Sequence, residues 1–260
     1  MALAINGRAP TKEEIAIKEV RAKLTDVILA DKTFDDDYYL LQWLKAQNLN
    51  PDKAETMIRN SIKWRADEGI HTNIAAEFSN EILEQFPIPF SKTKDGVPIG
   101  FVHMGKMNFK KGVTTLGRTG WNKYWAISYA QAEELMIAYN KTYSKDNGEI
   151  NSNSTRGIVG FVDAKNVSSL QLLNLDVIRR GVDSTRTLMN VFPAMFNFII
   201  FFNMSTSFKV LFNAIKPFLT GPALTVEING TDEKVWRGRL LEIVNLEVLN
   251  ELESHWKSPK

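Results

Sequence analysis

Two nearly continuous apolar runs, GIVGFVD at residues 157–163 and FNFIIFFN at residues 196–203, constrain the fold more than any other feature. A strand with apolar residues on both faces has to be covered on both faces, which is typical of parallel strands in α/β proteins. The stretch between the two runs, residues 168–191, has a helical pattern and is long enough for the crossover of a βαβ unit. Residues 97–104 and 224–229 are predicted as further strands. The sequence therefore predicts an α/β fold.

The first third of the chain has a helical pattern instead. Thr11 followed by Glu14 has the spacing of a capping box, and Pro51 stands where the first turn of a later helix is expected. Apolar residues recur at helical spacing after both signals. We therefore predict a helical N-terminal module over residues 1–86 and an α/β domain over residues 87–260.

Composition narrows the classes of function. Lys and Arg number 32 and Asp and Glu number 30, so the net charge of +2 provides no general excess for binding nucleic acid. There are no cysteines, and the three histidines show no spacing of a metal site. The sequence has no Gly-x-Ser-x-Gly motif and no phosphate-binding loop of the Walker type. We expect a protein that is not an enzyme, with no catalytic residue, no metal and no cofactor.

A phenylalanine-rich segment raises the question of what it covers. Seven of the 15 phenylalanines fall within residues 196–221. Phe208, Leu211, Phe212 and Ile215 stand at i, i+3, i+4 and i+7, so they share one helical face. The pattern alone favours an ordinary core helix. The other interpretation is an apolar cover over a ligand cavity.

Five segments occur in a fixed order along the chain: LLQWLKAQNLNPDKAETMIRNSIKWRADEGI (40–70), KDGVPIGF (94–101), GFVDAKNVSS (160–169), VFPAMFNFIIFFN (191–203) and AIKPFL (214–219). Together they resemble the CRAL-TRIO lipid-binding family of retinaldehyde-binding, tocopherol transfer and yeast phosphatidylinositol transfer proteins. The resemblance covers about residues 35–250. It implies a helical N-terminal cap and a CRAL-TRIO domain whose mostly parallel sheet floors an apolar cavity closed by a gate helix. The phenylalanine-rich helix falls at the gate, so the resemblance favours the cover interpretation.

The chain departs from the family where phosphatidylinositol-binding members hold the headgroup. The basic pair that these members use aligns with Gln47 and Asn48, and their glutamate aligns with Ala194. Lys216 is the one matching residue. A phosphate group would therefore meet few charge-assisted donors, and we disfavour phosphoinositide as the cavity ligand.

The family's phosphocholine-contacting hydroxyl positions align with Ile158 and Gly160, which carry no hydroxyl. The cavity that the resemblance implies therefore suits a nearly uncharged hydrophobe. Our hypothesis is a cytosolic carrier that binds one retinoid, tocopherol, squalene or similar isoprenoid and transfers it at membranes, with retinal as the preferred guess. Two alternatives stay open: a phospholipid (phosphatidylinositol or phosphatidylcholine) transfer protein, and a regulatory module that binds small GTPases or other signalling proteins.

Candidate site residues follow from these predictions. Lys209 and Lys216 share a helical face and are predicted to dock on anionic membrane. Strand register is not settled by a continuous apolar run, so the inward-pointing residues of the strands are not determined. The polar residues that stand near or within apolar segments and could orient a ligand carbonyl or hydroxyl are Tyr124, Ser128, Tyr129, Thr185 and Asn197. The predicted ligand-binding set is Tyr124, Trp125, Ser128, Tyr129, Ile158, Gly160, Phe161, Phe198, Ile200, Phe202, Phe208, Leu211, Phe212 and Ile215.

The beginning of the chain lacks the apolar stretch of a secretory signal, and no run of about 18 apolar residues could span a membrane. We expect a cytoplasmic monomer with peripheral membrane contact. Its expected partners are one hydrophobic small molecule and, transiently, a membrane surface, with no nucleic acid.

Overall fold

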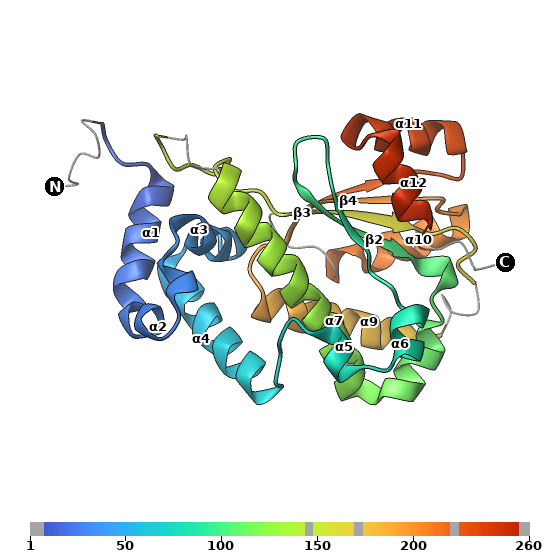
Figure 1. Cartoon of the computed structure of the whole chain (residues 1–260), viewed down its shortest axis with the longest axis horizontal. Helices are drawn as coiled ribbons and strands as arrows, with labels where there is room; N and C mark the ends of the chain where they lie inside the picture. The colour runs from blue at the N-terminus through green and yellow to red at the C-terminus, as the bar shows by residue number, and fades with distance from the viewer. Residues whose placement is uncertain (1–7, 144–147, 169–173, 219–223, 255–260) are drawn as a thin grey trace.

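The structure is a computed structural model, and it describes residues 8–143, 148–168, 174–218 and 224–254. Its centre is a five-stranded sheet in the order β1-β2-β3-β4-β5 (Figure 1). β1 runs antiparallel to β2, and every other neighbouring pair is parallel. The α/β fold expected from the sequence is confirmed. The strands are β1 (Phe90–Lys92), β2 (Pro98–His103), β3 (Ile158–Asp163), β4 (Phe196–Phe202) and β5 (Thr225–Ile228).

The predicted βαβ unit is present, because β3 and β4 are parallel neighbours joined through helix α9 (Leu175–Val191). The Asn174 side chain begins α9 by accepting hydrogen bonds from the backbone N–H groups of Asp176 and Val177. The predicted helical stretch began at residue 168, and residues 169–173 of it lie outside the described residues. Strand β1 was not predicted, and its three residues give too short a pattern to recognise.

A β-bulge at Asn197 decides which way the side chains of β4 point. Ile158 pairs with Phe196, but the next residue of β3, Val159, pairs with Phe198. Asn197 is therefore an extra residue, and the alternation of side chains shifts by one position after it. Consequently, even-numbered residues of β4 before the bulge and odd-numbered residues after it point to the same face of the sheet.

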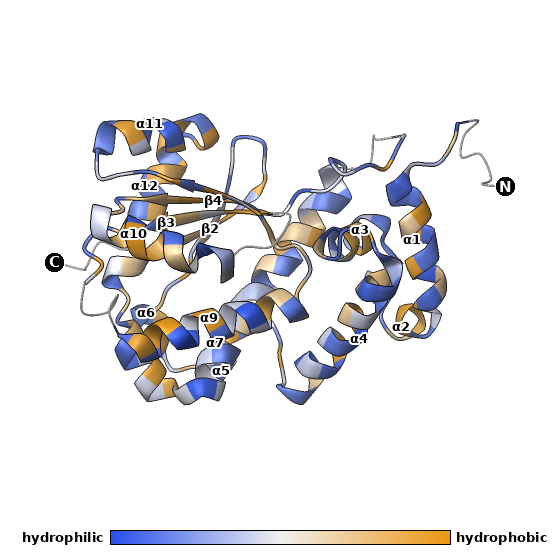
Figure 2. Cartoon of the chain, turned by 180° about the vertical axis from the view of Figure 1, so that it is seen from behind, coloured by the Kyte–Doolittle hydropathy of each residue, from blue (hydrophilic) through white to orange (hydrophobic). Residues whose placement is uncertain are grey.

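The two faces of the sheet are covered by different helices. Helices α11 (Glu233–Ile243) and α12 (Leu246–Ser254) lie on the side opposite α7 and α9 (Figure 1). On the α11 side, the ring of Phe202 stacks on Trp236 at 4.7 Å between centroids. Figure 2 shows that the central strands are mostly hydrophobic along their length, as strands covered on both faces must be.

Helix α7 (Phe109–Tyr143) crosses the other side and is kinked at Gly117, where φ is 64° and ψ is −172°. A residue with a Cβ would be strained in this backbone conformation. Residues 121–140, whose sequence has an amphipathic helical pattern, form the part of α7 after the kink. Helix α10 (Thr206–Ile215) follows β4 on the same side.

The N-terminal helices form a core of their own. Val20, Leu40, Trp43 and Ile58 are among the fully buried residues of this core. The capping box predicted for Thr11 and the start of α4 at Pro51 are both confirmed. The helices before the sheet are α1 (Lys12–Lys23), α2 (Thr25–Ala30), η1 (Lys32–Asp35), α3 (Asp37–Ala46), α4 (Pro51–Asp67), α5 (Ile74–Glu77) and α6 (Asn80–Gln85), and η2 (Met104–Lys106) and η3 (Lys216–Phe218) are short turns further on.

The last residues before the first strand belong to a different core. Ile82 and Phe86 pack with the residues of the sheet rather than with α1–α4. The division of the chain into domains at residue 86 stays a prediction. In the part of the chain that is described, no helix combines the length and the apolar character needed to cross a membrane.

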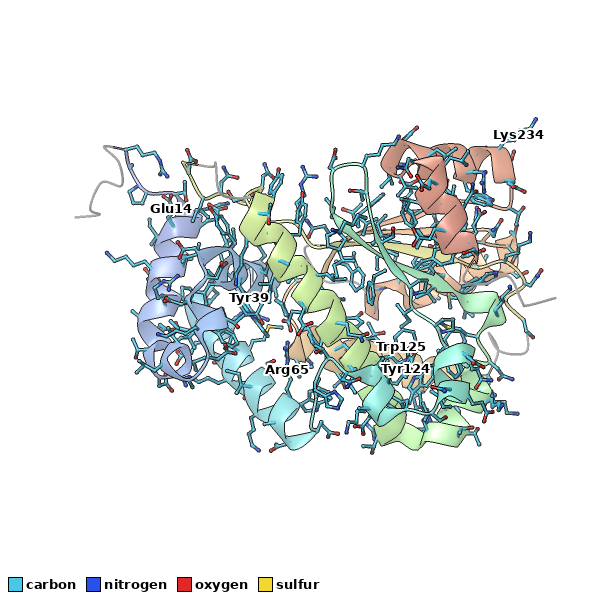
Figure 3. The ribbon with its side chains drawn as sticks, viewed as in Figure 1. Glu14, Tyr39, Arg65, Tyr124, Trp125 and Lys234 are labelled. Carbon is cyan, nitrogen blue, oxygen red and sulfur yellow. The ribbon has the colours of Figure 1, made fainter. Side chains whose placement is uncertain are left out.

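A buried ion pair joins the N-terminal helices to the rest of the molecule. Arg65 on α4 makes two hydrogen bonds to the carboxylate of Glu133 on α7, at 2.5 and 3.1 Å. The Tyr39 hydroxyl donates to the same carboxylate at 2.8 Å. The guanidinium also donates to the carbonyl of Val191 and lies 3.9 Å from the ring centroid of Phe192. Figure 3 shows Arg65 and Tyr39 between the N-terminal helices and α7.

Candidate ligand-binding cavity

A cavity of about 370 Å³ lies between the sheet and helices α7, α9 and α10. This volume falls within the range of small-molecule sites in proteins. The cavity is concave, and none of its described lining residues carries a charge. The lining residues are Ile88, Phe90, Gly100, Val102, Met104, Phe109, Val113, Trp121, Trp125, Ser128, Tyr129, Ala132, Gly160, Phe161, Val162, Val167, Val177, Ile178, Gly181, Val182, Ser184, Thr185, Leu188, Phe196, Ile199, Phe201, Phe208, Leu211 and Phe212.

Two glycines keep the floor of the cavity open. Gly100 on β2 pairs with Gly160 on β3, and both line the cavity. A Cβ at Gly160 would lie 3.0 Å from a side-chain carbon of Ile199, and a Cβ at Gly100 would lie 3.6 Å from the ring of Phe90. Larger residues at this pair would occupy space that the cavity now holds. The open floor is therefore built into the sheet.

The long wall comes from one face of α7. Trp125, Ser128, Tyr129 and Ala132 stand at i, i+3, i+4 and i+7, and all of them line the cavity. Trp125 packs edge-on against Trp121 at 5.7 Å. These large aromatic side chains give the wall shape and rigidity.

The second helical wall comes from α9. Gly181, Ser184, Thr185 and Leu188 line the cavity from one face of this helix. The Ser184 hydroxyl donates to the side-chain oxygen of Asn122 at 2.6 Å, which holds α9 against α7. The sequence contains the signal for this wall, because these residues stand at helical spacing, but we did not predict it.

Helix α10 covers the cavity with its apolar face. Phe208, Leu211 and Phe212 line the cavity, and the rings of Phe212 and Phe201 are 4.6 Å apart. The outer face is exposed and includes Val210, which is 69% exposed. The predicted apolar stripe is therefore present, and its described side chains face the cavity.

The start of α10 is held in a defined conformation. Asn203, just before it, has a φ of 56°, and its side-chain amide donates to Asp163 at 2.9 Å. The Ser205 side chain accepts from the backbone N–H of Phe208. Asp163, which ends β3, is also 3.5 Å from His103. These contacts fix the end of the cover nearest to the sheet.

Most of the predicted ligand-binding residues line the cavity. These eight are Trp125, Ser128, Tyr129, Gly160, Phe161, Phe208, Leu211 and Phe212. Thr185, predicted as a polar candidate, lines it as well. Ligand binding by these residues stays a prediction. The side chain of Ile215 lies outside the described residues.

The prediction for β4 needs a correction. We named Phe198, Ile200 and Phe202, but Ile200 and Phe202 are buried in the core below α11 and none of the three is a lining residue. The bulge at Asn197 shifts the alternation, so the residues that face the cavity are Phe196, Ile199 and Phe201.

Three more predicted residues lie elsewhere. The Tyr124 hydroxyl donates to the backbone carbonyl of Phe86, which directs its ring into the core. Ile158 is fully buried in a cluster with Ala132 and Leu188, which line the cavity, but is not itself a lining residue. Asn197 is not among the described lining residues, and its buried side-chain oxygen has no hydrogen-bond partner among the described residues.

An α/β domain with an apolar cavity on a parallel sheet and an apolar helix over the opening is the arrangement that the resemblance to the CRAL-TRIO lipid-binding family implied. The resemblance to this family is confirmed by its relatives, although no family model matches the chain. The chain is 26% identical over 244 residues to "Phosphatidylinositol/phosphatidylcholine transfer protein SFH9" of Arabidopsis thaliana, covering 90% of this chain and 39% of that protein. It is 25% identical over 222 residues to the "SEC14 cytosolic factor" of Candida glabrata, covering 82% of this chain and 68% of that protein.

A solved structure supports the fold. The structure described as "Crystal structure of Sfh5" has a TM-score of 0.60 to this chain at 12% identity, covering 87% of this chain and 83% of that one. At this identity the similarity concerns the fold alone. The plant relatives that match most of this chain are longer proteins, and the chain spans about two fifths of their length.

Proposed function

We propose that this protein binds a single lipid in the cavity and transfers it between membranes. The observation that carries the proposal is the apolar cavity under α10, whose inner face presents Phe208 and Phe212 to the space below. Closed, this helix shields an apolar ligand from water. Open at a bilayer, the same apolar face can enter the headgroup region and lower the barrier to release. The relatives named as lipid transfer proteins support the same function.

Phospholipid is the first candidate for the ligand, as the relatives named for phosphatidylinositol and phosphatidylcholine transfer favour it over an isoprenoid. The retinal that we preferred from the sequence has no support from these relatives. The second candidate, a neutral isoprenoid, rests on a specific observation: the described lining residues carry no charge. A phospholipid would therefore place its acyl chains in the cavity and its phosphate outside the described wall.

We further propose that the protein carries its ligand without chemical change and acts in the cytoplasm with peripheral membrane contact. The hydroxyls of Ser128 and Ser184 in the wall donate to oxygen atoms of the protein, and no histidine is among the described lining residues to activate them. The cavity therefore offers binding and shielding rather than a nucleophile.

Native mass spectrometry of gently purified protein tests this function. We expect one bound lipid per chain, and Gly100→Leu should reduce its occupancy several-fold by filling the floor of the cavity. Gly238→Leu on α11 is the matched control, because Gly238 is exposed and a Cβ there would meet nothing within 4 Å. Bound phosphatidylinositol or phosphatidylcholine would favour the first candidate and a bound isoprenoid the second. Equal occupancy in both variants would contradict the cavity as the site.

Lys209 is expected to assist docking on anionic membranes. It lies on α10 beside the apolar face and forms no ion pair with any described residue. We expect Lys209→Glu to slow transfer to anionic vesicles about fivefold or more, because a basic residue near an anionic surface contributes about 1 kcal/mol. Transfer to neutral vesicles should change little.

The control for this prediction is Lys234→Glu. Lys234 is exposed on α11, on the other side of the sheet (Figure 3), so the same charge reversal there should leave transfer unchanged. Equal slowing by both variants would indicate a general effect of net charge and remove the docking role of Lys209. The docking role of Lys216, which begins η3 and is half-buried, stays a prediction.

A further inference from the structure

The polar groups of the cavity wall divide into two kinds. The Ser128 hydroxyl donates to the Tyr124 carbonyl at 3.0 Å, and the Ser184 hydroxyl donates to Asn122 at 2.6 Å. Both serine hydroxyls therefore already donate a hydrogen bond within the protein. The hydroxyls of Tyr129 and Thr185 form no hydrogen bond with any described residue, although both residues line the cavity.

Thr185 differs from its neighbour on the same helix in an informative way. Thr187 donates to the carbonyl of Asp183 four residues earlier, at 3.0 Å, as hydroxyls within helices commonly do. Thr185 makes no such bond with a described residue and lies on the face of α9 that lines the cavity with Ser184 and Leu188. Its proton is therefore available to a ligand.

Tyr129 is held rigidly by aromatic neighbours. Its ring packs against Phe192 at 5.5 Å and Phe196 at 5.6 Å, both in edge-on geometry. Burial raises the pKa of Tyr129 to about 12, so the phenol keeps its proton at any physiological pH and can act as a donor. Leaving a donor in an apolar cavity without a partner costs free energy, which an acceptor atom on a ligand would recover.

The other donors of the wall are also neutral. The indole N–H groups of Trp121 and Trp125 form no hydrogen bond with a described residue. No lysine, arginine, aspartate or glutamate stands among the described lining residues. The described wall thus has neutral hydrogen-bond donors and no charged side chain. Such a wall can bind an uncharged oxygen atom, but it offers no counter-charge to a buried anion.

We propose that Tyr129 and Thr185 donate hydrogen bonds to an uncharged oxygen of the bound lipid, a proposal that rests on the lipid-binding function proposed above. The ligand class is therefore a lipid with an ester carbonyl, an aldehyde or a hydroxyl inside the cavity, rather than a pure hydrocarbon. Two sources share this chemistry: the acyl esters of a glycerophospholipid, and the single oxygen of an oxygenated isoprenoid. In the first case the phosphate stays outside the described wall.

Matched ligand pairs test the proposal. The first pair is dioleoyl phosphatidylcholine and its diether analogue, which lacks both carbonyls. The second pair is retinal and squalene, an isoprenoid with an oxygen and one without. Binding of each is measured by competition against a fluorescent lipid, for the full chain and for Tyr129→Phe and Thr185→Val, which remove the hydroxyls with little change in shape.

We expect each variant to bind the oxygenated member of a pair about three- to tenfold more weakly, which is the range for one neutral hydrogen bond. Affinity for the diether and for squalene should stay within about twofold. The phospholipid pair responds if the source is an acyl ester, and the retinal pair responds if it is an isoprenoid oxygen. Equal loss for both members of each pair, or no loss for either, would overturn the proposal.

Tyr139→Phe is the matched control. Tyr139 on α7 also has a buried hydroxyl that bonds to no described residue, but it is not among the residues that line the cavity. The same chemical change there should leave all four affinities unchanged. If the unmodified protein binds none of the four lipids, the proposed function fails and this inference fails with it. If it binds them but the variants do not discriminate, the inference alone fails.

Discussion

Replacing Phe212 by aspartate should raise the rate at which a bound fluorescent lipid leaves the protein by at least tenfold. The Phe212 side chain is 4% exposed, lines the cavity and packs on Phe201 and Phe208. A carboxylate at this position would be buried against apolar side chains, and burying an ionised group in apolar surroundings costs several kcal/mol. The closed position of α10 is destabilised by that amount. Stopped-flow transfer to acceptor vesicles measures the rate.

Asn213→Asp is the control for this variant. Asn213 is the next residue of α10 and is exposed on its outer face, so the substitution adds the same charge to the same helix without burying it. We expect its off-rate to stay within about twofold of the unmodified protein. An unchanged off-rate for Phe212→Asp would show that α10 does not retain the ligand and would contradict its assignment as the gate.

Replacing Arg65 by alanine should lower the free energy of unfolding by about 3–5 kcal/mol, because it leaves a buried carboxylate without its partner. Glu133 is 5% exposed and accepts from both Arg65 and Tyr39. Burial and the adjacent Glu133 raise the pKa of the Tyr39 phenol well above its usual value, so Tyr39 keeps its proton but supplies no positive charge. Chemical denaturation followed by tryptophan fluorescence measures the loss.

Two variants separate the buried pair from general effects on α4. Lys63→Ala removes an exposed pair with Asp67 on the same helix, and we expect a change of less than about 0.5 kcal/mol. Arg65→Lys keeps the charge but loses the two-pronged contact with Glu133, so its loss should lie between those of the other two variants. If Arg65→Ala and Lys63→Ala had the same effect, the junction would depend on packing rather than on this ion pair.

The elements with strong local signals could be predicted from the sequence. The capping box at Thr11, the start of α4 at Pro51 and the apolar stripe on α10 depend on residues within one or two turns of each other. Local hydrogen bonds and helical periodicity determine such features, so a short stretch of sequence contains all the information required. The apolar runs of β3 and β4 similarly required cover on both faces.

The cavity wall could be predicted only in part, because contacts between distant segments form it. The face of α7 that includes Trp125 and Tyr129 and the face of α9 that includes Thr185 become one wall only when the helices pack on the same side of the sheet. The open floor depends on Gly100 lying beside Gly160, far from it along the chain. No local sequence pattern indicates that two such distant glycines will pair.

The amino-acid sequence by itself determined the α/β class, the helical beginning of the chain and the apolar stripe of α10, while the place of α10 over the cavity was expected only from the family resemblance. The sequence did not determine which β4 side chains face the ligand space, because both faces of an entirely apolar strand look alike. The one extra residue at Asn197 reverses the alternation when β4 pairs with β3. Regular alternation from Phe196 would select Phe198, whereas the observed pairing turns Ile199 and Phe201 toward the cavity.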